Sequence, residues 1–321
     1  MSFKDKKILI TGGVGYLGSA LAREINNFGG NAIQVSSRKL PSEKYFRVLQ
    51  GDVCTLDFWL DNLPKIDTVY HFAGNTSVAY AESHALECLS SAIQPIDHLI
   101  LAANILKKKV RVIFSSTATV YGLTTELPVD ESTVPRPITN YDLYKLFSEE
   151  KLALAHRQGI IESISVRLSN VYGPSPSMGQ VDGRGVLNKA AMIAIESKSL
   201  SVYGTGKYIR DYVYIDDVIR AFMKLEARSV SSGLTLNVGS GKGIALYDAF
   251  KLISDCIKEI LDETVNLKLI DWPNNSQEID RRNYVANIDL IKSVCGWEPK
   301  IDIKEGVNLL LNHYNSSNKT Y

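Results

Sequence analysis

Tyr141 and Lys145, four positions apart, are the residues of this chain best placed to do chemistry together. Residues at this spacing lie on one face of a helix, so the phenol and the ammonium can meet. The ammonium favours the phenolate and lowers the phenol pKa, which lets Tyr141 exchange a proton near neutral pH. Thr117, at the end of a hydroxyl-rich strand, can orient the oxygen that exchanges this proton. A packed tyrosine beside a solvated lysine is the alternative, and it would be preferred if the pair stood alone.

A glycine-rich turn early in the chain accompanies the pair. It lies between a predicted buried strand over residues 7–11 and a helix whose apolar residues recur at helical spacing. Glycines there allow the backbone to approach a pyrophosphate, and the helix N-terminus favours its negative charge. Glycines also punctuate ordinary turns, but the strand before and the helix after favour a bound dinucleotide. A dinucleotide beside a proton-exchanging phenol predicts redox chemistry on an alcohol or ketone. The residues of this turn predicted to contact the dinucleotide are Gly12, Gly15, Tyr16, Leu17 and Gly18.

The end of the second predicted strand indicates which dinucleotide is used. A carboxylate there binds the ribose hydroxyls of NAD, whereas a cation accommodates the extra phosphate of NADP. This chain has Ser36, Ser37 and Arg38 instead of a carboxylate, so we expect NADP, with NAD as the alternative. An ordinary solvated loop would also carry such cations. Asp52 and Val53, after the third strand, are expected to contact the adenine, although an aspartate is also common in plain turns.

The order of the elements predicts a doubly wound, Rossmann-type parallel α/β sheet. Strands are expected over residues 32–36, 46–49, 68–73, 110–114 and 161–167, and helices over 86–107 and from Tyr141 to about His156. A stretch rich in Pro, Gly and Ser follows over 175–185, then short strands and helices near 215–225, 246–260 and 303–314. We expect residues 1–174, with 213–242, to form the dinucleotide-binding domain. The remainder of 175–321, mainly 175–212 and 243–321, is expected to form a smaller α/β lobe that binds the substrate.

Composition excludes several other classes of protein. The chain has 321 residues, 45% of them hydrophobic, and a net charge of +1, so it has no electrostatic reason to bind nucleic acid or a membrane surface. Its four cysteines have no paired spacing and its five histidines are dispersed, which predicts neither disulfides nor a metal site. The polar N-terminus does not resemble a signal peptide. We therefore expect a cytoplasmic protein whose partners are small molecules and a second copy of itself.

Further segments in a fixed order resemble the extended short-chain dehydrogenase/reductase family, which comprises nucleotide-sugar epimerases and dehydratases. The resemblance extends from Lys7 to Leu311. It implies that Thr117, Tyr141 and Lys145 are catalytic and that the substrate is a nucleotide-diphosphate sugar. The segments that carry it are residues 12–18, 71–74, 115–122, 141–145, 167–174, 203–206, 210–212, 237–241 and 296–299.

The same resemblance implies further contacts. Cofactor contacts are implied for Phe72, Ala73, Gly74, Ser115, Tyr141 and Lys145. Substrate contacts are implied for Thr117, Asn170, Leu187, Arg210 and Arg281, or Arg282 in place of Arg281. A guanidinium fork matches phosphate oxygens, although a structural ion pair is the alternative for each arginine. Asn170 could equally brace a turn.

Departures from the family pattern reduce the number of reactions that the resemblance allows for this chain. The 4,6-dehydratases place an Asp-Glu pair directly after the catalytic threonine, where this chain has Ala118 and Thr119. Epimerase-reductases acting on carbons three and five use a cysteine and a histidine, where this chain has hydroxyl residues and Ser175-Pro176. We therefore expect reduction of a 4-keto sugar by NADPH with Tyr141 as the proton donor. An NAD-dependent 4-epimerase is the alternative, and a dinucleotide sensor without catalysis is a remote one.

Family members commonly dimerise through two helices of each subunit. The corresponding segments here are residues 86–107 and 140–156, and both offer apolar faces beyond what one core needs. We therefore expect a homodimer with a four-helix interface.

Overall fold

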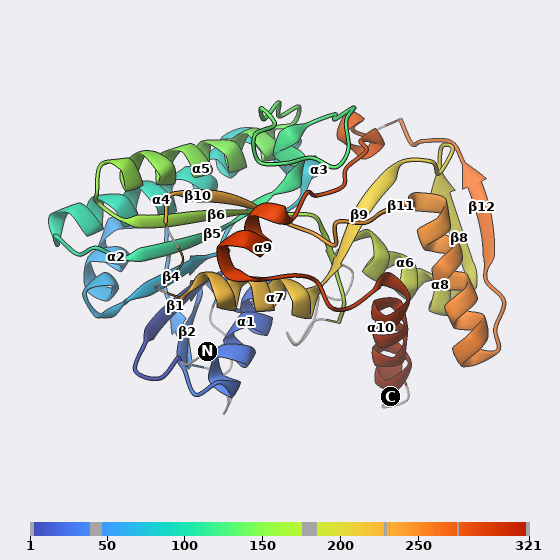
Figure 1. Ribbon diagram of the computed structural model, residues 1–321, viewed down its shortest axis with the longest axis horizontal. Coiled ribbons are helices and arrows are strands. Elements are labelled where there is room, and N and C mark those ends of the chain that lie inside the picture. The colour runs from blue at the N-terminus through green and yellow to red at the C-terminus, as the bar shows by residue number, and fades with distance from the viewer. Residues whose placement is uncertain are drawn as a thin grey trace.

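A seven-stranded sheet organises the structure, a computed structural model that describes residues 3–38, 47–174, 185–227, 230, 232–274 and 276–318. Every pairing in this sheet is parallel, and the strand order is β10-β6-β5-β4-β1-β2-β3. The predicted Rossmann-type α/β fold is therefore confirmed (Figure 1). The strands are β1 (Lys7–Thr11), β2 (Asn31–Ser36), β3 (Arg47–Gln50), β4 (Thr68–His71), β5 (Arg111–Thr117), β6 (Glu162–Leu168) and β10 (Leu234–Val238).

The strand order reverses beside β1. From there the chain runs to β2 and β3 in one direction, and from β4 to β5 and β6 in the other. In open parallel sheets the crevice at such a reversal, outside the carboxyl ends of the strands, is where ligands bind. The glycine-rich turn follows β1, and the segment that begins at Phe72 follows β4, so both lie at this crevice.

Helices cover both faces of the sheet, so central strands such as β1 and β4 are buried on both sides. In Figure 1, α4 and α5 lie side by side on one face, whereas α1 and α7 pack together on the other. α5 begins after Thr139, whose hydroxyl accepts a hydrogen bond from the Asp142 amide at 3.2 Å. The helices of this part are α1 (Tyr16–Asn27), α2 (Leu56–Asn62), α3 (Val78–Ser83), α4 (Ala85–Ile105), α5 (Asn140–Arg157) and α7 (Ile215–Leu225).

A second group of elements lies at the other end of the molecule in Figure 1. It contains a three-stranded sheet in the order β11-β9-β7 and a pair of parallel strands, β12 and β8. The helices α6, α8 and α10 pack against one another beside these strands. The bounds are β7 (Asn170–Tyr172), α6 (Val186–Ser197), β8 (Ser199–Tyr203), β9 (Ile209–Tyr214), β11 (Gly243–Ala245), α8 (Leu246–Leu261), β12 (Asn266–Ile270) and α10 (Ile303–Asn318). The helix α9 (Asp289–Cys295) lies instead against β10 of the large sheet.

Three short 3-10 helices complete the assignment: η1 (Leu63–Lys65), η2 (Ala118–Tyr121) and η3 (Glu278–Arg281). The structure adjusts two predicted strands. β5 continues to Thr117 rather than ending at residue 114, and β4 ends at His71 rather than at residue 73. The segment predicted as a loop over 175–185 lies outside the described residues, except for Gly185.

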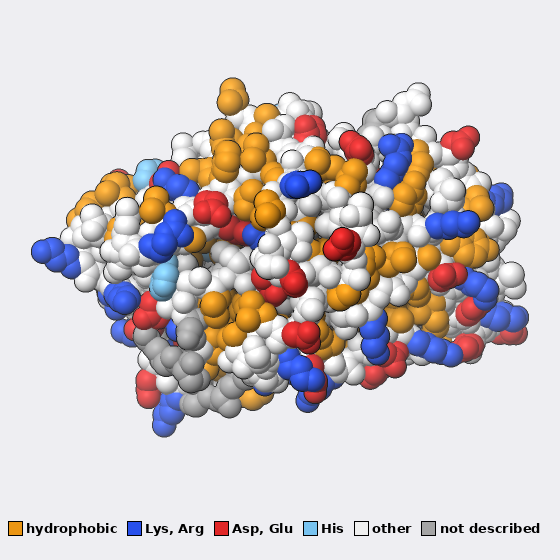
Figure 2. Space-filling model, turned by 45° about the horizontal axis from the view of Figure 1, so that its top comes forward, with side chains coloured by type: hydrophobic (Ala, Val, Ile, Leu, Met, Phe, Trp, Pro, Cys, Tyr) orange, Lys and Arg blue, Asp and Glu red, His pale blue; other side chains and the backbone are white. Residues whose placement is uncertain are grey.

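The surface agrees with the low net charge. Acidic and basic side chains are interspersed over the face shown in Figure 2. No helix in the described ranges is both long and apolar enough to cross a lipid bilayer. Among those residues, no three His, Cys, Asp or Glu side chains are grouped so that they could hold a metal ion.

Candidate active site

The structure brings the three predicted catalytic residues together where α5 begins above the end of β5. Thr117 is the last residue of β5, and its side chain is hydrogen-bonded to that of Tyr141. The Lys145 ammonium, one turn further along α5, donates to the Ser115 carbonyl at 2.8 Å. It also lies 4.7 Å from the centroid of the Phe114 ring. The phenol and the ammonium are therefore both fixed against the carboxyl end of β5.

The predicted lowering of the Tyr141 pKa is wrong for this arrangement. Burial raises the pKa of the phenol, and the neighbouring carboxylate of Asp142 raises it further. The Thr117 hydrogen bond and Arg282 lower it, but by less. Lys145 is not among the groups that shift the Tyr141 pKa, and its ammonium donates to the Ser115 carbonyl. Tyr141 thus carries its proton in this state, which suits a proton donor.

Burial changes the pKa of Lys145 in the direction opposite to that of Tyr141. It lowers the pKa of the ammonium to about 8, and Glu149 opposes part of this change. A lysine with this pKa is close to the point at which it changes charge at neutral pH. The protonation of Lys145 therefore depends on its neighbours.

The glycine-rich turn has the geometry that a pyrophosphate requires. Gly12 has a φ of 63°, and a Cβ at this position would lie 2.9 Å from the Ala73 amide nitrogen. A Cβ on Gly18 would collide with the Gly12 carbonyl oxygen. α1 begins at Tyr16 after Gly15 with no side chain capping its first turn, so its amides can meet an anion. These residues fit a dinucleotide: the turn would hold its pyrophosphate, and the nicotinamide would lie toward Tyr141.

The other two residues predicted in this turn contribute through packing. The Tyr16 hydroxyl donates to the Gly173 carbonyl at 2.9 Å, and this bond ties the start of α1 to the segment after β7. The Leu17 side chain packs against the main hydrophobic core. A dinucleotide would therefore meet their backbone amides at the helix N-terminus.

A buried hydrogen-bond group joins the two loops at the crevice. The Thr11 hydroxyl oxygen accepts from the amides of Phe72 and Ala73, both at 3.1 Å. Its single hydrogen is therefore directed at Nδ1 of His71, 2.8 Å away. Burial, and to a smaller extent the charge of Lys145, together lower the pKa of His71 to about 3. His71 is a neutral acceptor; it begins the family segment 71–74, but the sequence assigned it no role of its own.

Tyr141 and Lys145 line one small cavity together with residues that the sequence predicts to contact the cofactor. It lies between the segment after β4 and the inner face of α5. Its lining includes the predicted cofactor residues Ala73 and Gly74 together with Tyr141 and Lys145. The full lining is His71, Ala73, Gly74, Asn75, Cys88, Ala92, Phe114, Tyr141, Tyr144, Lys145 and Ser148.

The predicted determinants of cofactor choice lie at the carboxyl ends of β2 and β3. The Ser36 hydroxyl is buried and accepts from the Arg38 amide at 3.1 Å, whereas the side chains of Ser37 and Arg38 are exposed. Asp52 closes a turn by accepting from the Cys54 amide at 2.9 Å. Val53 accepts from the indole of Trp59 at 2.8 Å through its carbonyl. Cofactor contacts at these residues stay predictions.

Two of the arginines predicted from the sequence to bind substrate lie close to each other. Arg282 donates to the Asn170 side-chain oxygen at 3.2 Å, and the Asn170 amide donates to the Asp211 carbonyl at 3.1 Å. Arg210 donates to the backbone carbonyls of Asp280 and Arg282. Burial and the charge of Arg282 lower the pKa of Arg210 to about 10. Neighbouring guanidinium groups repel each other, so this arrangement favours a bound anion.

The remaining predicted substrate residues lie elsewhere. Arg281 is exposed, stacks over the Trp272 ring at 5.5 Å and donates to Ser276 at 3.3 Å. Of the two alternatives left open by the sequence, Arg282 faces Asn170 and Tyr141. Leu187 is fully buried in the main core, so its side chain is not available to a substrate.

Comparison with known proteins identifies the family. The model of the NAD dependent epimerase/dehydratase family matches residues 8–239, and the chain therefore belongs to this family, as the sequence resemblance indicated. A UDP-glucose 4-epimerase from Azospirillum brasilense is 26% identical over 94% of this chain and 89% of its own length. A human dTDP-D-glucose 4,6-dehydratase is also 26% identical, over 96% of this chain and 90% of its own length.

Solved structures agree. The UDP-glucose 4-epimerase of Thermotoga maritima with UDP-glucose has a TM-score of 0.85 and 25% identity, over 97% of this chain and 99% of the other. MoeE5 in complex with UDP-glucuronic acid and NAD has a TM-score of 0.83 and 25% identity, with the same two coverages. The protein is thus an enzyme of the extended short-chain dehydrogenase/reductase type.

Proposed function

We propose that the protein is a 4-epimerase that acts on a nucleotide-diphosphate sugar. The observation that carries the proposal is the convergence of Thr117, Tyr141 and Lys145 at a cavity that the segment after β4 also lines. When bound, NAD supplies the acceptor and donor of a hydride. For oxidation at carbon 4, Tyr141 would first have to give up the proton it carries without substrate, and its phenolate would then accept the hydroxyl proton as the hydride passes to NAD. The phenol would return that proton when the hydride comes back, and Thr117 would orient the hydroxyl.

The residues after Thr117 favour this reaction over elimination of water. Ala118 has no titratable group, and Thr119 hydrogen-bonds to Thr117 at 2.8 Å between their hydroxyl oxygens. Neither can serve as the acid or base that removes water from a sugar. UDP-glucose 4-epimerases and 4,6-dehydratases are equally similar to the chain, so the choice rests on Ala118 and Thr119.

Reduction of a 4-keto sugar by NADPH is the second candidate. Two observations favour it. Ser36, Ser37 and Arg38 place hydroxyls and a cation, rather than a carboxylate, at the end of β2. Tyr141 keeps its proton, as a donor to an alkoxide must. NADP would then replace NAD as the cofactor.

Arg282, Arg210 and Asn170 are proposed to receive the diphosphate. Two neighbouring cations match its charge, and the Asn170 side chain holds Arg282 toward Tyr141. The Thermotoga maritima epimerase and MoeE5 are solved with UDP-sugars, so a uridine nucleotide is the first to test. The four cysteines are free thiols, which supports the cytoplasm as the compartment.

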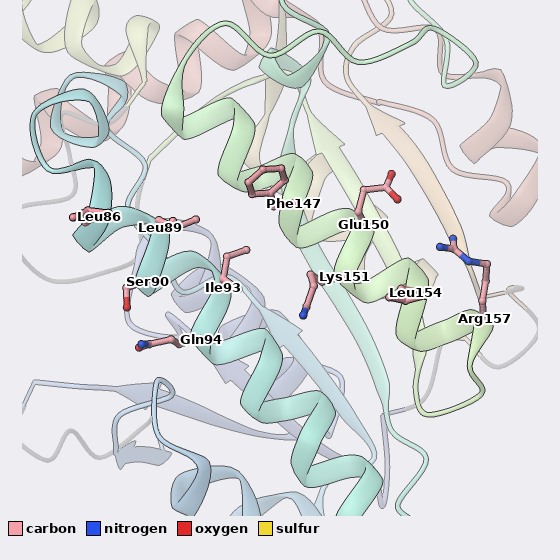
Figure 3. A pocket seen from close by; sticks show the side chains of 10 residues that line it. All are labelled: Leu86, Leu89, Ser90, Ile93, Gln94, Phe147, Glu150, Lys151, Leu154 and Arg157. Atoms are coloured by element: carbon pink, nitrogen blue, oxygen red, sulfur yellow. The ribbon is translucent and has the colours of Figure 1, made fainter.

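We further propose that the enzyme is a homodimer. α4 and α5 leave an apolar groove between them, with a cavity volume of about 650 Å³ (Figure 3). Leu86 is 83% exposed there, and Phe147 and Leu154 are 44% and 45% exposed, which is unfavourable in water. The same two helices of a second copy would cover the groove and complete a four-helix interface. The groove is lined by Leu86, Leu89, Ser90, Ile93, Gln94, Phe147, Glu150, Lys151, Leu154 and Arg157.

One experiment separates the two reactions. Purified protein is denatured to release and identify its nicotinamide, and fresh enzyme is incubated with UDP-glucose, UDP-N-acetylglucosamine or dTDP-glucose while products are followed by proton NMR. Inversion at carbon 4 without net change in nicotinamide absorbance supports the epimerase. Consumption of NADPH only with a 4-keto nucleotide sugar supports the reductase. If neither occurs, while a relative assayed in parallel is active, the proposal is rejected.

A further inference from the structure

A buried acid continues the catalytic stripe of α5. Tyr141, Lys145 and Glu149 follow one another at intervals of four residues, so they lie along one face of the helix. That face packs against β5, which supplies a partner to each of them. Thr117 is hydrogen-bonded to Tyr141, the Ser115 carbonyl accepts from Lys145, and the Ser116 hydroxyl donates to Glu149.

Glu149 is held as a carboxylate by an arginine from the next strand. The side chain of Arg167 on β6 donates through Nε to both Glu149 oxygens at 3.1 Å, and through Nη2 to one of them at 2.6 Å. Both residues are almost fully buried. Although burial lowers the pKa of Arg167, its bonds to Glu149 raise it overall. The pair is thus ionised and fixed by three hydrogen bonds.

The far side of Arg167 is also held in place. Its guanidinium lies 4.7 Å from the centroid of the Tyr121 ring. The Tyr121 hydroxyl in turn donates to the side-chain oxygen of Asn237 on β10 at 2.9 Å. The Glu149 carboxylate is therefore at the end of a series of contacts that passes through β6, η2 and β10.

Stability alone gives no reason for this pair. Removing two charges from water is costly, and apolar residues of similar volume commonly serve a core as well or better. The location of Glu149 offers a reason, because it lies one helical turn from the ammonium of Lys145 and raises the pKa of that group. An anion at this place stabilises the protonated lysine.

Glu149 is the one charge that acts on the pKa of Lys145 among the described groups. Cys88 of α4 and Tyr144 of α5, which line the same cavity, have a raised pKa and keep their protons. Asp142 of α5 is bonded to Thr139.

His71 from β4 is neutral because burial lowers its pKa to about 3. Tyr141 from α5 keeps its proton, because burial raises its pKa. β5 presents the Phe114 ring and the Ser115 carbonyl. Arg167 from β6 is a cation that is already bonded to Glu149. Glu149 is the charged partner that opposes the burial of Lys145.

We propose that Glu149, fixed by Arg167 and Ser116, is a positioning residue that keeps Lys145 protonated and directed at the Ser115 carbonyl at neutral pH. The inference rests on the proposed function only in taking Lys145 as the lysine that serves the reaction. Arg167 and Ser116 act through Glu149, and Glu149 acts through Lys145. None of these three needs to touch the substrate.

The test measures the lysine itself in the apoprotein. The protein is labelled with 13Cε-lysine, the resonance of Lys145 is assigned with Lys145→Met, and its pH titration is followed by NMR. The midpoint is expected near 8 in the wild type. In Glu149→Gln it should fall by roughly 1 to 3 pH units, the usual effect of one close charge. Glu150→Gln, an exposed acid beside it in α5, is the matched control and should leave the midpoint unchanged.

Two further variants keep the test decisive if Glu149→Gln does not fold because Arg167 loses its partner. Ser116→Ala keeps the ion pair and should shift the midpoint in the same direction by less. Glu149→Gln with Arg167→Met removes both charges together and should again lower the midpoint. An unchanged midpoint in the folded variants overturns the proposal.

An activity profile gives a second, separate reading. In Ser116→Ala and in the double variant, the alkaline limb of kcat against pH should move to lower pH with the NMR midpoint. A uniform loss at every pH would show a merely structural role and would also overturn the inference. If the midpoint shifts but no nucleotide sugar is turned over even by the wild type, the proposed function fails while the role of Glu149 in holding the Lys145 proton stands.

Discussion

His71 should make the folded protein sensitive to mild acid. Its pKa is lowered from 6.5 to about 3, whereas in the unfolded chain the imidazole titrates near 6.5. Between these values the unfolded state binds more protons, so the stability rises with pH across this window and is lost as the pH falls through it. At about 1.36 kcal/mol per pH unit, the full difference corresponds to roughly 5 kcal/mol, reached near pH 3.

A substantial part of this effect on the free energy of unfolding is measurable under mild conditions. Linkage for this one residue lowers the free energy of unfolding by about 2 kcal/mol between pH 7.5 and pH 5. His71→Asn removes the titration and can still offer an oxygen to the Thr11 hydroxyl, which now bonds to Nδ1 at 2.8 Å. Urea unfolding of the apoprotein at the two pH values should therefore show a drop that is about 2 kcal/mol smaller in this variant than in the wild type.

A matched control and a direct measurement accompany this comparison. His84, an exposed histidine at the start of α4, gives the control variant His84→Asn, which should keep the wild-type drop. The ring resonances of His71 in the wild type should not titrate above about pH 4.5, since burial holds its pKa near 3. The reasoning is refuted if the His71→Asn variant loses as much stability as the wild type, or if His71 titrates near pH 6.5.

Further predictions concern the site and the assembly. Tyr141→Phe should reduce turnover by about two to four orders of magnitude while cofactor affinity, measured by fluorescence titration, stays nearly unchanged; turnover within tenfold of wild type would contradict the assignment. Arg282→Ala should weaken UDP binding in calorimetry by roughly tenfold or more, whereas Arg281→Ala should have little effect; equal losses would be inconsistent with the placement of Arg282 beside Asn170. If NADP is the cofactor, Arg38→Ala should reduce its preference over NAD by about 1 to 3 kcal/mol, and a silent variant with tighter NAD binding would favour the epimerase. Phe147→Glu should place a charge inside the proposed four-helix interface and give monomers in sedimentation velocity; a wild-type protein that is monomeric at micromolar concentration would contradict the proposed homodimer.

The sheet and the two motifs could be predicted because local sequence determines them. A run such as Ile8 to Ile10 is buried on both faces, and a parallel strand of that kind reads as apolar without interruption. The glycines must lie where the chain turns sharply, and at Gly12 a side chain would strike the loop after β4. Helix α6 was not predicted, because its start follows the Pro- and Gly-rich segment and carries no capping side chain.

The electrostatics of the site depend on tertiary packing, which the spacing of Tyr141 and Lys145 does not reveal. The two residues do share a helix face, as expected. However, the Lys145 ammonium donates to the Ser115 carbonyl of β5, and Lys145 is not among the groups that shift the pKa of the phenol. Burial and Asp142 then decide the direction of the shift. A motif can therefore identify the reacting groups, but their protonation depends on burial and on contacts with other elements, which the motif does not reveal.

The sequence also could not show which of two adjacent arginines, Arg281 or Arg282, contacts Asn170. η3 ends at Arg281, and Arg282 adopts an extended backbone with ψ of 156°, so the two side chains leave the chain in different directions. Arg210 fixes this change of direction by binding the carbonyls of Asp280 and Arg282, residues about 70 positions away in sequence. Arg210 therefore does two things: it adds positive charge to the proposed diphosphate site and determines which of its neighbours shares that site. Arg210→Lys keeps the positive charge but replaces the forked guanidinium with a single ammonium. It should weaken UDP binding more than the loss of one phosphate contact would, because the lysine cannot hold both carbonyls and Arg282 is released.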